Sequence, residues 1–187
     1  LIGAHYLGVS VLCSSCNIKV INRILRSVVS ECNKGNPCLI SLAWTEPDAG
    51  TDSSEIPLLP QAKVRTQATK VAGGYMVNGS KVFISAGHVS TWHMLICYED
   101  IRRPADTLIM LAVINGMKGF TFGHKEEKMG QKACVASELI FEDCFVPDAN
   151  VCFSKDQVRR LNITAKEAGL KMIGLFPAVT QPGVASI

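Results

Sequence analysis

The sequence has little excess charge of either sign. Its 19 lysines and arginines against 16 aspartates and glutamates leave a formal net charge of +3 over 187 residues. A nucleic-acid-binding surface needs a denser basic cluster than this, so we expect no nucleic-acid partner. With 48% hydrophobic and 19% charged residues, the chain can bury a sizeable core. The composition therefore predicts a folded globular protein rather than a disordered one.

Long apolar runs are missing as well. The longest, at residues 7–13 and 107–114, fall far short of the roughly 20 residues that cross a bilayer, so we expect no membrane span. The first 13 residues have the apolar character of a signal peptide, but no basic leader precedes them and a basic helical pattern follows. We therefore interpret this segment as an internal start within a longer chain.

Complete metal-binding and phosphate-binding motifs are also missing. Cys13 and Cys16 form a single C-x-x-C, without a second pair or a histidine at ligand distance. The four histidines follow no metal-ligand spacing, so we interpret each as a capped or surface imidazole. The glycine spacing in residues 44–52 is that of neither a P-loop nor a G-x-G-x-x-G motif. We predict no metal site and neither type of phosphate loop.

The eight cysteines do not form a recognisable disulfide framework. They lie within apolar runs such as residues 95–98 and 141–147. Reduced, buried thiols are typical of proteins in a reducing compartment. We therefore expect a cytoplasmic protein with free, buried cysteines.

The hydrophobic period changes near residue 37. Apolar residues at helical spacing predict an amphipathic helix over residues 18–32, which ends where Gly35 and Pro37 prevent its continuation. The Asn78-Gly79 pair predicts a two-residue hairpin turn, and the capping-box spacing of Ser154 predicts the start of a second helix. Short strands without intervening helices predict an α+β fold, with an antiparallel β-barrel or sandwich flanked by helices. The predicted strands are residues 39–44, 62–69, 75–77, 81–84, 94–98, 108–114, 119–122 and 138–142.

Two segments carry candidate chemistry. Residues 44–52 gather hydroxyls, carboxylates, proline and glycine at the end of a predicted strand, where Gly50 allows close backbone approach or a positive φ. On composition alone, a tight loop that caps its own backbone is favoured about two to one over a ligand-binding loop. In residues 81–87, Phe83 could face a planar ring, although a core position for Phe83 and a capping role for Ser85 are the commoner outcomes.

Together with a third segment, these two resemble one family. The stretches LAWTEPDAGTD, GGYMVNGSKVFISAG and KMGQKACVASELIFEDCFVP are similar, in order and separation, to three signature stretches in the middle β-domain of acyl-CoA dehydrogenases. The resemblance is strong over residues 39–150. It implies closing helices of an N-terminal helical domain over residues 1–37, an FAD-binding middle domain over residues 38–153, and a linker helix with the start of a C-terminal helical domain over residues 154–187.

The resemblance also implies a set of cofactor contacts. In the family, the first stretch lies beside the flavin, and its second hydroxyl residue, here Thr51, also lies next to the bound acyl-CoA. Phe83 takes the place of an aromatic residue that stacks near the flavin, and Ser85 lies near the flavin nitrogen that accepts hydride. The implied FAD contacts are Leu42, Ala43, Trp44, Thr45, Gly50, Thr51, Phe83, Ile84 and Ser85.

The activity that the resemblance implies is α,β-desaturation of an acyl-CoA thioester, with hydride transfer to FAD. The family's catalytic glutamate is expected beyond Ile187, and Glu46, Glu99 and Glu138 do not occupy its motif, so we assign no catalytic residue and expect the isolated chain to be inactive. Electron-transfer flavoprotein is the implied electron acceptor, and a homotetramer the implied assembly. Two alternatives remain open: an oxygen-using oxidase or monooxygenase of the same fold, and a non-catalytic β-domain that serves binding or assembly.

Overall fold

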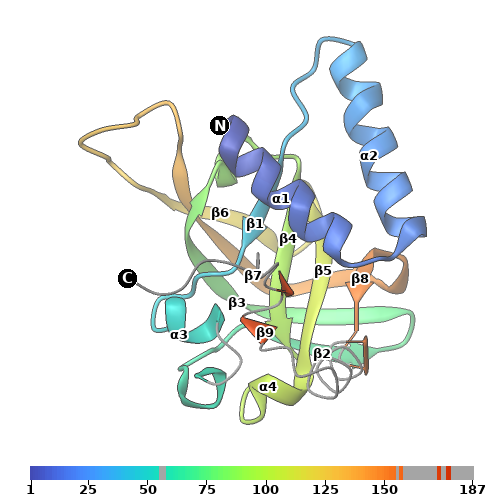
Figure 1. Ribbon diagram of the computed structural model, residues 1–187, viewed down its shortest axis with the longest axis vertical. Coiled ribbons are helices and arrows are strands. Elements are labelled where there is room, and N and C mark those ends of the chain that lie inside the picture. The colour runs from blue at the N-terminus through green and yellow to red at the C-terminus, as the bar shows by residue number, and fades with distance from the viewer. Residues whose placement is uncertain (55–57, 155, 158–171, 174–175, 178–187) are drawn as a thin grey trace, which may run out of the picture.

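The computed structural model describes residues 1–54, 58–154, 156–157, 172–173 and 176–177. Two helices, α1 (Ile2–Ser14) and α2 (Ile18–Asn33), precede a β-rich region (Figure 1). The helix predicted from residue 154 lies largely outside the described residues. The strands are β1 (Ile40–Ala43), β2 (Gln67–Val71), β3 (Gly74–Ser85), β4 (Trp92–Tyr98), β5 (Leu108–Ile114), β6 (Phe120–Lys125), β7 (Ala136–Pro147), β8 (Val151–Phe153), β9 (Met172–Ile173) and β10 (Phe176–Pro177). Short helical turns form at α3 (Thr51–Ser54), η1 (Leu59–Gln61), η2 (Gly87–Val89), α4 (Pro104–Thr107) and η3 (Asp148–Asn150).

Eight strands form one sheet in the order β6-β7-β3-β2-β4-β5-β8, with β1 paired to β4. Most neighbours are antiparallel, whereas β1 runs parallel to β4, and β2 meets β4 in parallel through Gln67 and Tyr98. The predicted α+β fold, with an antiparallel sheet and flanking helices, is confirmed. The sheet is open rather than closed into a barrel.

Strand β4 lies at the centre of the core because all seven of its residues are buried. Successive side chains of a strand point to opposite faces, so β4 contributes to two apolar clusters. Met94 and Ile96 belong to the cluster beneath α1 and α2, whereas Leu95 and Cys97 belong to the cluster shared with β3 and β7. A strand buried on both faces explains the uninterrupted apolar run at residues 94–98.

The two N-terminal helices differ in how they are buried. Helix α2 is amphipathic as predicted and buries Val20, Ile24 and Val28, and its N-cap Asn17 accepts a hydrogen bond from the Val20 amide at 3.4 Å. Helix α1 lies across β1 and β4 (Figure 1), where a Cβ on Gly8 would approach the Ile40 carbonyl oxygen to 2.5 Å. Glycine at this position therefore lets the helix lie directly against β1.

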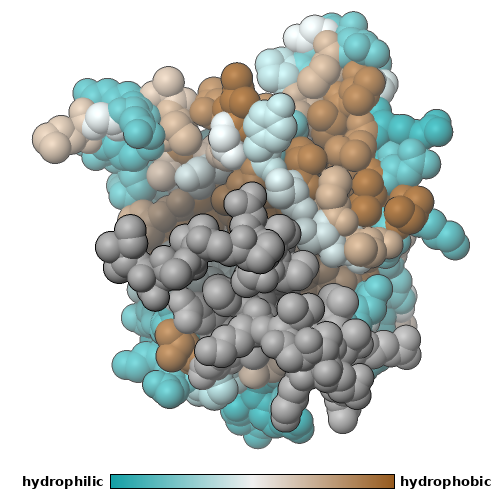
Figure 2. All heavy atoms as spheres, viewed as in Figure 1, coloured by the Kyte–Doolittle hydropathy of each residue, from teal (hydrophilic) through white to brown (hydrophobic). Residues whose placement is uncertain are grey.

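Apolar side chains remain exposed over these helices. Figure 2 shows hydrophobic residues gathered in the upper right part of the molecule, where Figure 1 places α1 and α2. Ile2 and Tyr6 of α1 and Ile18 and Val29 of α2 are among the exposed hydrophobic residues. An apolar surface of this kind is typical of a region that other protein covers.

The predicted Asn78-Gly79 hairpin turn is wrong. Strand β3 continues through both residues, and the hairpin turn lies at residues 72–73, between the paired residues Val71 and Gly74. The Asn78 side chain instead reaches across the sheet, where its Oδ1 accepts a hydrogen bond from the Asp143 amide at 2.8 Å. Pairing of β3 with β7 on one edge, and with β2 on the other, overrides the local turn preference.

Gly79 nevertheless has a conformational reason to be glycine. Its φ is +139°, and a Cβ there would lie 2.6 Å from the Cα of Thr66. The pairing register of β3 with β7 shifts between Val77 and Gly79, where β7 carries one extra residue, so Gly79 lies opposite a β-bulge of β7. Asn-Gly at this point therefore marks an irregular strand rather than a turn.

The predicted strand over residues 62–69 starts later than expected. Strand β2 begins at Gln67, because the amides of Arg65 and Thr66 donate hydrogen bonds to the carboxylate of Glu46 instead of to a neighbouring strand. The alternating pattern of residues 62–66 therefore reflects an extended segment held by a side chain.

Substitution of Gly79 tests this account of the β-bulge. We expect Gly79→Ala to lower the free energy of unfolding by about 3 kcal/mol, because backbone strain adds to a clash with Thr66. Gly116→Ala is the matched control: its φ is +85° but a Cβ there meets nothing within 4 Å, so about 1 kcal/mol of strain is expected. Urea unfolding measures both variants, and equal losses would contradict the proposed clash.

Candidate functional site

Three segments that are distant in the sequence meet at the C-terminal end of β3. On one side, the Val82 amide donates a hydrogen bond to the Thr45 carbonyl at 2.9 Å, which ties the loop after β1 to the strand. On the other side, residues 84–85 pair with residues 136–137 of β7. The three stretches singled out in the sequence therefore form one junction, which we call the β3 junction.

Phe83 lies in a β-bulge at this junction. Lys81 pairs with Leu139, and Ile84 pairs with Ser137. Between these two pairs β3 has two residues, Val82 and Phe83, where β7 has one. Phe83 has a φ of +57°, and its side chain is 60% exposed. The alternative of a core position for Phe83 is therefore wrong: the bulge turns this ring outward while Ile84 remains buried. Left-handed backbone at a bulky residue is strained and is concentrated at functional sites.

Part of the loop after β1 caps its own backbone. Asp52 Oδ1 accepts hydrogen bonds from the amides of Gly50 and Ser53, at 2.7 and 3.0 Å. The hydroxyls of Ser53 and Ser54 donate to the carbonyls of Gly50 and Thr51, both at 2.7 Å. For these side chains the local-capping interpretation is confirmed.

Three hydroxyls at the β3 junction are different. Thr45 is half-buried, and Thr51 and Ser85 are exposed. None of the three side chains makes a hydrogen bond to another residue within the described ranges. The alternative of a capping role for Ser85 is therefore wrong. Thr45 and Ser85 bring these unpaired hydroxyls close to the exposed ring of Phe83, since the Thr45 carbonyl bonds to Val82 and Ser85 follows Phe83 on β3. This combination suits a planar ligand rich in acceptors.

The remaining predicted FAD contacts are less accessible to a ligand. Ala43 and Ile84 are buried, so only their backbone could face a ligand, and Leu42 and Trp44 pack against the helix-side cluster. Gly50 lies outside the positive-φ region, so that interpretation is wrong. A Cβ at Gly50 would meet nothing within 4 Å, which leaves the close-approach interpretation in place.

A buried ion pair lies behind the β3 junction. Lys81 Nζ is 2.7 Å from Glu46 Oε1, and the two side chains are 0% and 1% exposed. Burial lowers the pKa of Lys81 below its ordinary range, and the charge of Glu46 opposes that shift. The sequence analysis assigned neither residue a role. The one sequence signal for the pair was that Glu46 lies in the candidate segment 44–52 and Lys81 in the candidate segment 81–87.

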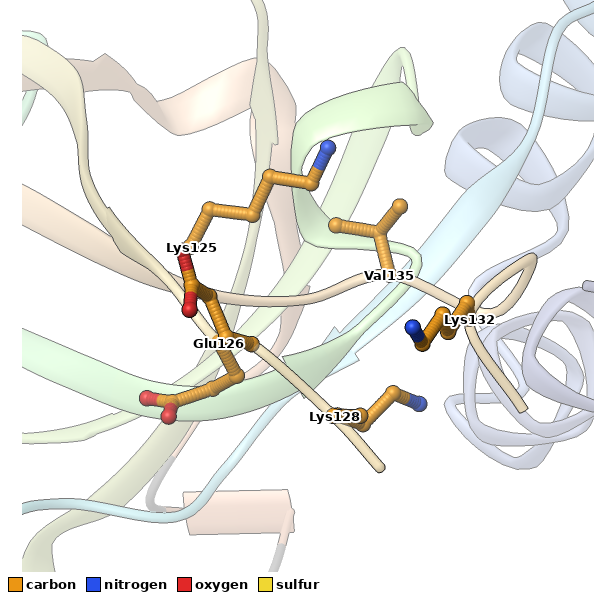
Figure 3. A pocket seen from close by; sticks show the side chains of 6 residues that line it. Lys125, Glu126, Lys128, Lys132 and Val135 are labelled. Carbon is orange, nitrogen blue, oxygen red and sulfur yellow. The ribbon is translucent and has the colours of Figure 1, made fainter. Parts of the chain in front are cut away.

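A cavity of about 490 Å³ borders the β3 junction beneath the loop that connects β6 and β7. Figure 3 shows the side chains of Lys128 and Lys132 pointing into the same space, with Glu126 on an adjoining wall. The cavity ends at Val135, whose carbonyl accepts a hydrogen bond from the Ala86 amide at 2.6 Å. None of the nine predicted FAD contacts lines it.

His93 is fully buried, whereas the sequence predicted a capped or surface imidazole. Its Nδ1 is 2.8 Å from the Ser41 hydroxyl, and its Nε2 is 2.8 Å from Asn115 Oδ1. The imidazole and Ser41 are both fully buried, so this serine–histidine–asparagine array supports the core and has no access to a substrate. Burial lowers the pKa of His93 to about 4, which keeps the ring neutral.

The burial predicted for the cysteines is found for only some of them. All eight cysteines are free, as expected, but Cys13, Cys16 and Cys32 are exposed, so the prediction that the thiols are buried is wrong for these three. The described residues contain no group of three or more histidine, cysteine or acidic side chains that could hold a metal ion. No helix among these residues is long and apolar enough to cross a membrane.

Comparison with known proteins identifies the same region. A family model described as "Acyl-CoA dehydrogenase, middle domain" matches residues 41–144, more than half of the chain. The mitochondrial long-chain specific acyl-CoA dehydrogenase of Mus musculus is 39% identical over 112 residues, covering 59% of this chain and 24% of that protein. Acyl-CoA dehydrogenase from Geobacillus kaustophilus aligns with a TM-score of 0.60 at 27% identity, over 80% of this chain and 40% of that one. A chain in the structure of the electron transferring flavoprotein of Acidaminococcus fermentans aligns with a TM-score of 0.58 at 28% identity, over 78% of this chain and 39% of that one.

Most of the open sheet, together with the β3 junction, lies within the region that the middle-domain model matches. The chain belongs to the acyl-CoA dehydrogenase family, which confirms the resemblance seen in the sequence. It spans about a quarter of the length of the curated relatives that it matches.

The buried state of His93 predicts a pH dependence. The unfolded chain protonates this imidazole below a pKa of about 6.5, whereas the folded chain does so only near 4. The unfolded state therefore binds more protons in this window, and stability falls as the pH drops from about 6.5 toward 4. Relative to His93→Gln, we expect the wild-type free energy of unfolding to fall by about 2–3 kcal/mol between pH 7 and 4.5. Parallel pH profiles from urea unfolding would contradict this.

Proposed function

We propose that this chain is the FAD-binding part of an acyl-CoA dehydrogenase, an enzyme that desaturates an acyl-CoA thioester to a 2-enoyl-CoA. The observation that carries the proposal is the β3 junction, where the Thr45 carbonyl accepts a hydrogen bond from the amide next to the outward-turned Phe83, and where the hydroxyls of Thr45 and Ser85 have no partner among the described residues. The division into an N-terminal helical part, a middle domain and the start of a C-terminal domain, at residues 37 and 153, belongs to the same proposal.

The residues of the β3 junction fit the flavin chemically. When bound, FAD accepts a hydride from the β-carbon of the thioester. Thr45 would donate a hydrogen bond to the edge of the ring system, and Ser85 would donate beside the nitrogen that receives the hydride. Fixed hydroxyl donors stabilise the negative charge that develops on reduction, and an aromatic wall at Phe83 excludes water. The open space at Gly50 allows the backbone to lie close to the cofactor.

The substrate and the redox partner follow from the same assignment. Thr51, at the exposed end of the loop, would contact the acyl-CoA as well as the flavin. No residue of this chain is assigned as the catalytic base, so the chain alone is proposed to be inactive. Electron-transfer flavoprotein is the proposed electron acceptor. Similarity to a chain in the A. fermentans flavoprotein structure supports it.

The exposed apolar side chains and the free cysteines bear on assembly and location. Exposed apolar side chains on α1 and α2, including Ile2 and Ile18, support a larger assembly such as a homotetramer, because such surfaces are normally covered. Eight free cysteines support a reducing compartment, and we propose the cytoplasm.

Direct FAD binding tests the proposed function. Added FAD should remain with the purified chain after desalting, with its visible absorption band shifted relative to that of free FAD. We expect Thr45→Ala and Ser85→Ala each to weaken binding about tenfold, because each removes a hydrogen bond worth about 1.4 kcal/mol. Titration followed by flavin absorbance measures the dissociation constants.

Thr121→Ala provides the matched control for these two variants. Thr121 is an exposed hydroxyl residue on β6, outside the β3 junction, so its loss should leave the dissociation constant unchanged. Equal affinity in the two junction variants and the wild type would remove the assigned roles. Failure of the wild-type chain to retain FAD would contradict its proposed role as a self-sufficient cofactor site.

A further inference from the structure

The buried pair of Lys81 and Glu46 joins two segments of the β3 junction. Lys81 belongs to β3, and Glu46 belongs to the loop that follows β1. Both side chains are almost completely inaccessible, and their charged atoms are 2.7 Å apart. Both lie within two residues of a proposed flavin contact, since Glu46 follows Thr45 and Lys81 precedes Phe83 by two positions.

The ammonium group of Lys81 fixes both neighbours of Thr45. Lys81 Nζ donates one hydrogen bond to the Trp44 carbonyl at 2.9 Å and another to Glu46 Oε1 at 2.7 Å. The Thr45 carbonyl itself accepts the hydrogen bond from the Val82 amide. Three consecutive residues of the loop are therefore held by two consecutive residues of β3.

The second carboxylate oxygen of Glu46 holds another segment in place. Glu46 Oε2 accepts hydrogen bonds from the amides of Arg65 and Thr66, the latter at 3.1 Å. Glu46 and Ala49 also exchange backbone hydrogen bonds at 2.9 and 3.3 Å, which closes the turn of the loop. One ion pair thus connects the loop after β1, the segment before β2 and strand β3.

Stability alone does not explain an ion pair at this position. Two charges removed from water lose hydration that their mutual attraction only partly returns, and apolar residues of similar volume are often equally stable. An ion pair differs from apolar residues because its hydrogen bonds are directional and hold atoms at specific places. Here the fixed atoms are backbone groups on both sides of Thr45.

We propose that Lys81 and Glu46 are positioning residues, which hold Thr45 in register with Phe83 and Ser85 at the β3 junction. The proposal rests on the proposed function, in which these three residues contact the flavin. Neither member of the pair touches the cofactor. Loss of the pair releases the loop and separates Thr45 from Ser85.

The first measurement is amide hydrogen exchange on the whole 187-residue chain without cofactor. In Lys81→Met we expect the amides of Val82, Arg65 and Thr66 to exchange at least about tenfold faster, because their hydrogen bonds depend on the pair. Amides of α2, which belongs to none of the segments that the pair holds, should keep their wild-type exchange rates. Unchanged exchange at Val82, Arg65 and Thr66 would overturn the proposal.

The second measurement is FAD titration with a control of matched stability. We expect Lys81→Met and Glu46→Gln each to weaken FAD binding at least about tenfold and to move the visible band of the remaining bound flavin toward that of free FAD. Ile24→Ala removes buried side-chain volume from α2, which carries none of the proposed FAD contacts, so it lowers stability without touching the loop. It should bind FAD with the wild-type band and affinity.

A further variant keeps the test decisive if Lys81→Met fails to fold. The double variant Lys81→Met with Glu46→Leu replaces the pair by apolar groups, so it should fold while still releasing the loop. Wild-type FAD affinity and wild-type exchange rates in this variant would overturn the positioning role. Failure of the wild-type chain to bind FAD would overturn the proposed function instead, and hydrogen exchange would then decide the positioning of the loop by itself.

Discussion

The contact between the Lys81 ammonium and the Glu46 carboxylate is the interaction on which the β3 junction depends. It is a charged contact sealed from solvent, so its hydrogen bonds are not exchanged for water. Its partners are the Trp44 carbonyl and the amides of Arg65 and Thr66. The same pair therefore explains why the loop after β1 lies against β3 and why strand β2 starts only at Gln67.

Strain at Phe83 is the second constraint, and it complements the first. We would not expect the Val82 amide to face Thr45 if β3 paired regularly with β7 at this point. The extra residue of the bulge frees that amide from the β7 ladder and rotates the Phe83 ring into solvent. A left-handed phenylalanine persists only where the surroundings fix it, here by the pairing of Ile84 with Ser137 on one side and the ion pair on the other.

The fold leaves the β3 junction on the surface of a rigid support. Strand β4, buried on both faces, joins the cluster beneath the helices to the cluster between β3 and β7. The flavin contacts proposed here therefore sit on strand ends and a tightly bonded loop, a placement that limits their movement.

Sequence by itself determined the elements whose side-chain pattern is local. The sequence alone predicted the amphipathic helix α2, the apolar strand β4 and the three signature stretches. These features were enough to predict the α+β fold and the family. Tertiary structure decided the rest. Asn78-Gly79 stayed within a strand, opposite a bulge of β7, because strands pair with β3 on both edges. Phe83 is turned outward because β3 has one extra residue there. Lys81 and Glu46 met because loop and strand converge, and no pattern of period 2 or 3.6 records a contact between residues 35 positions apart.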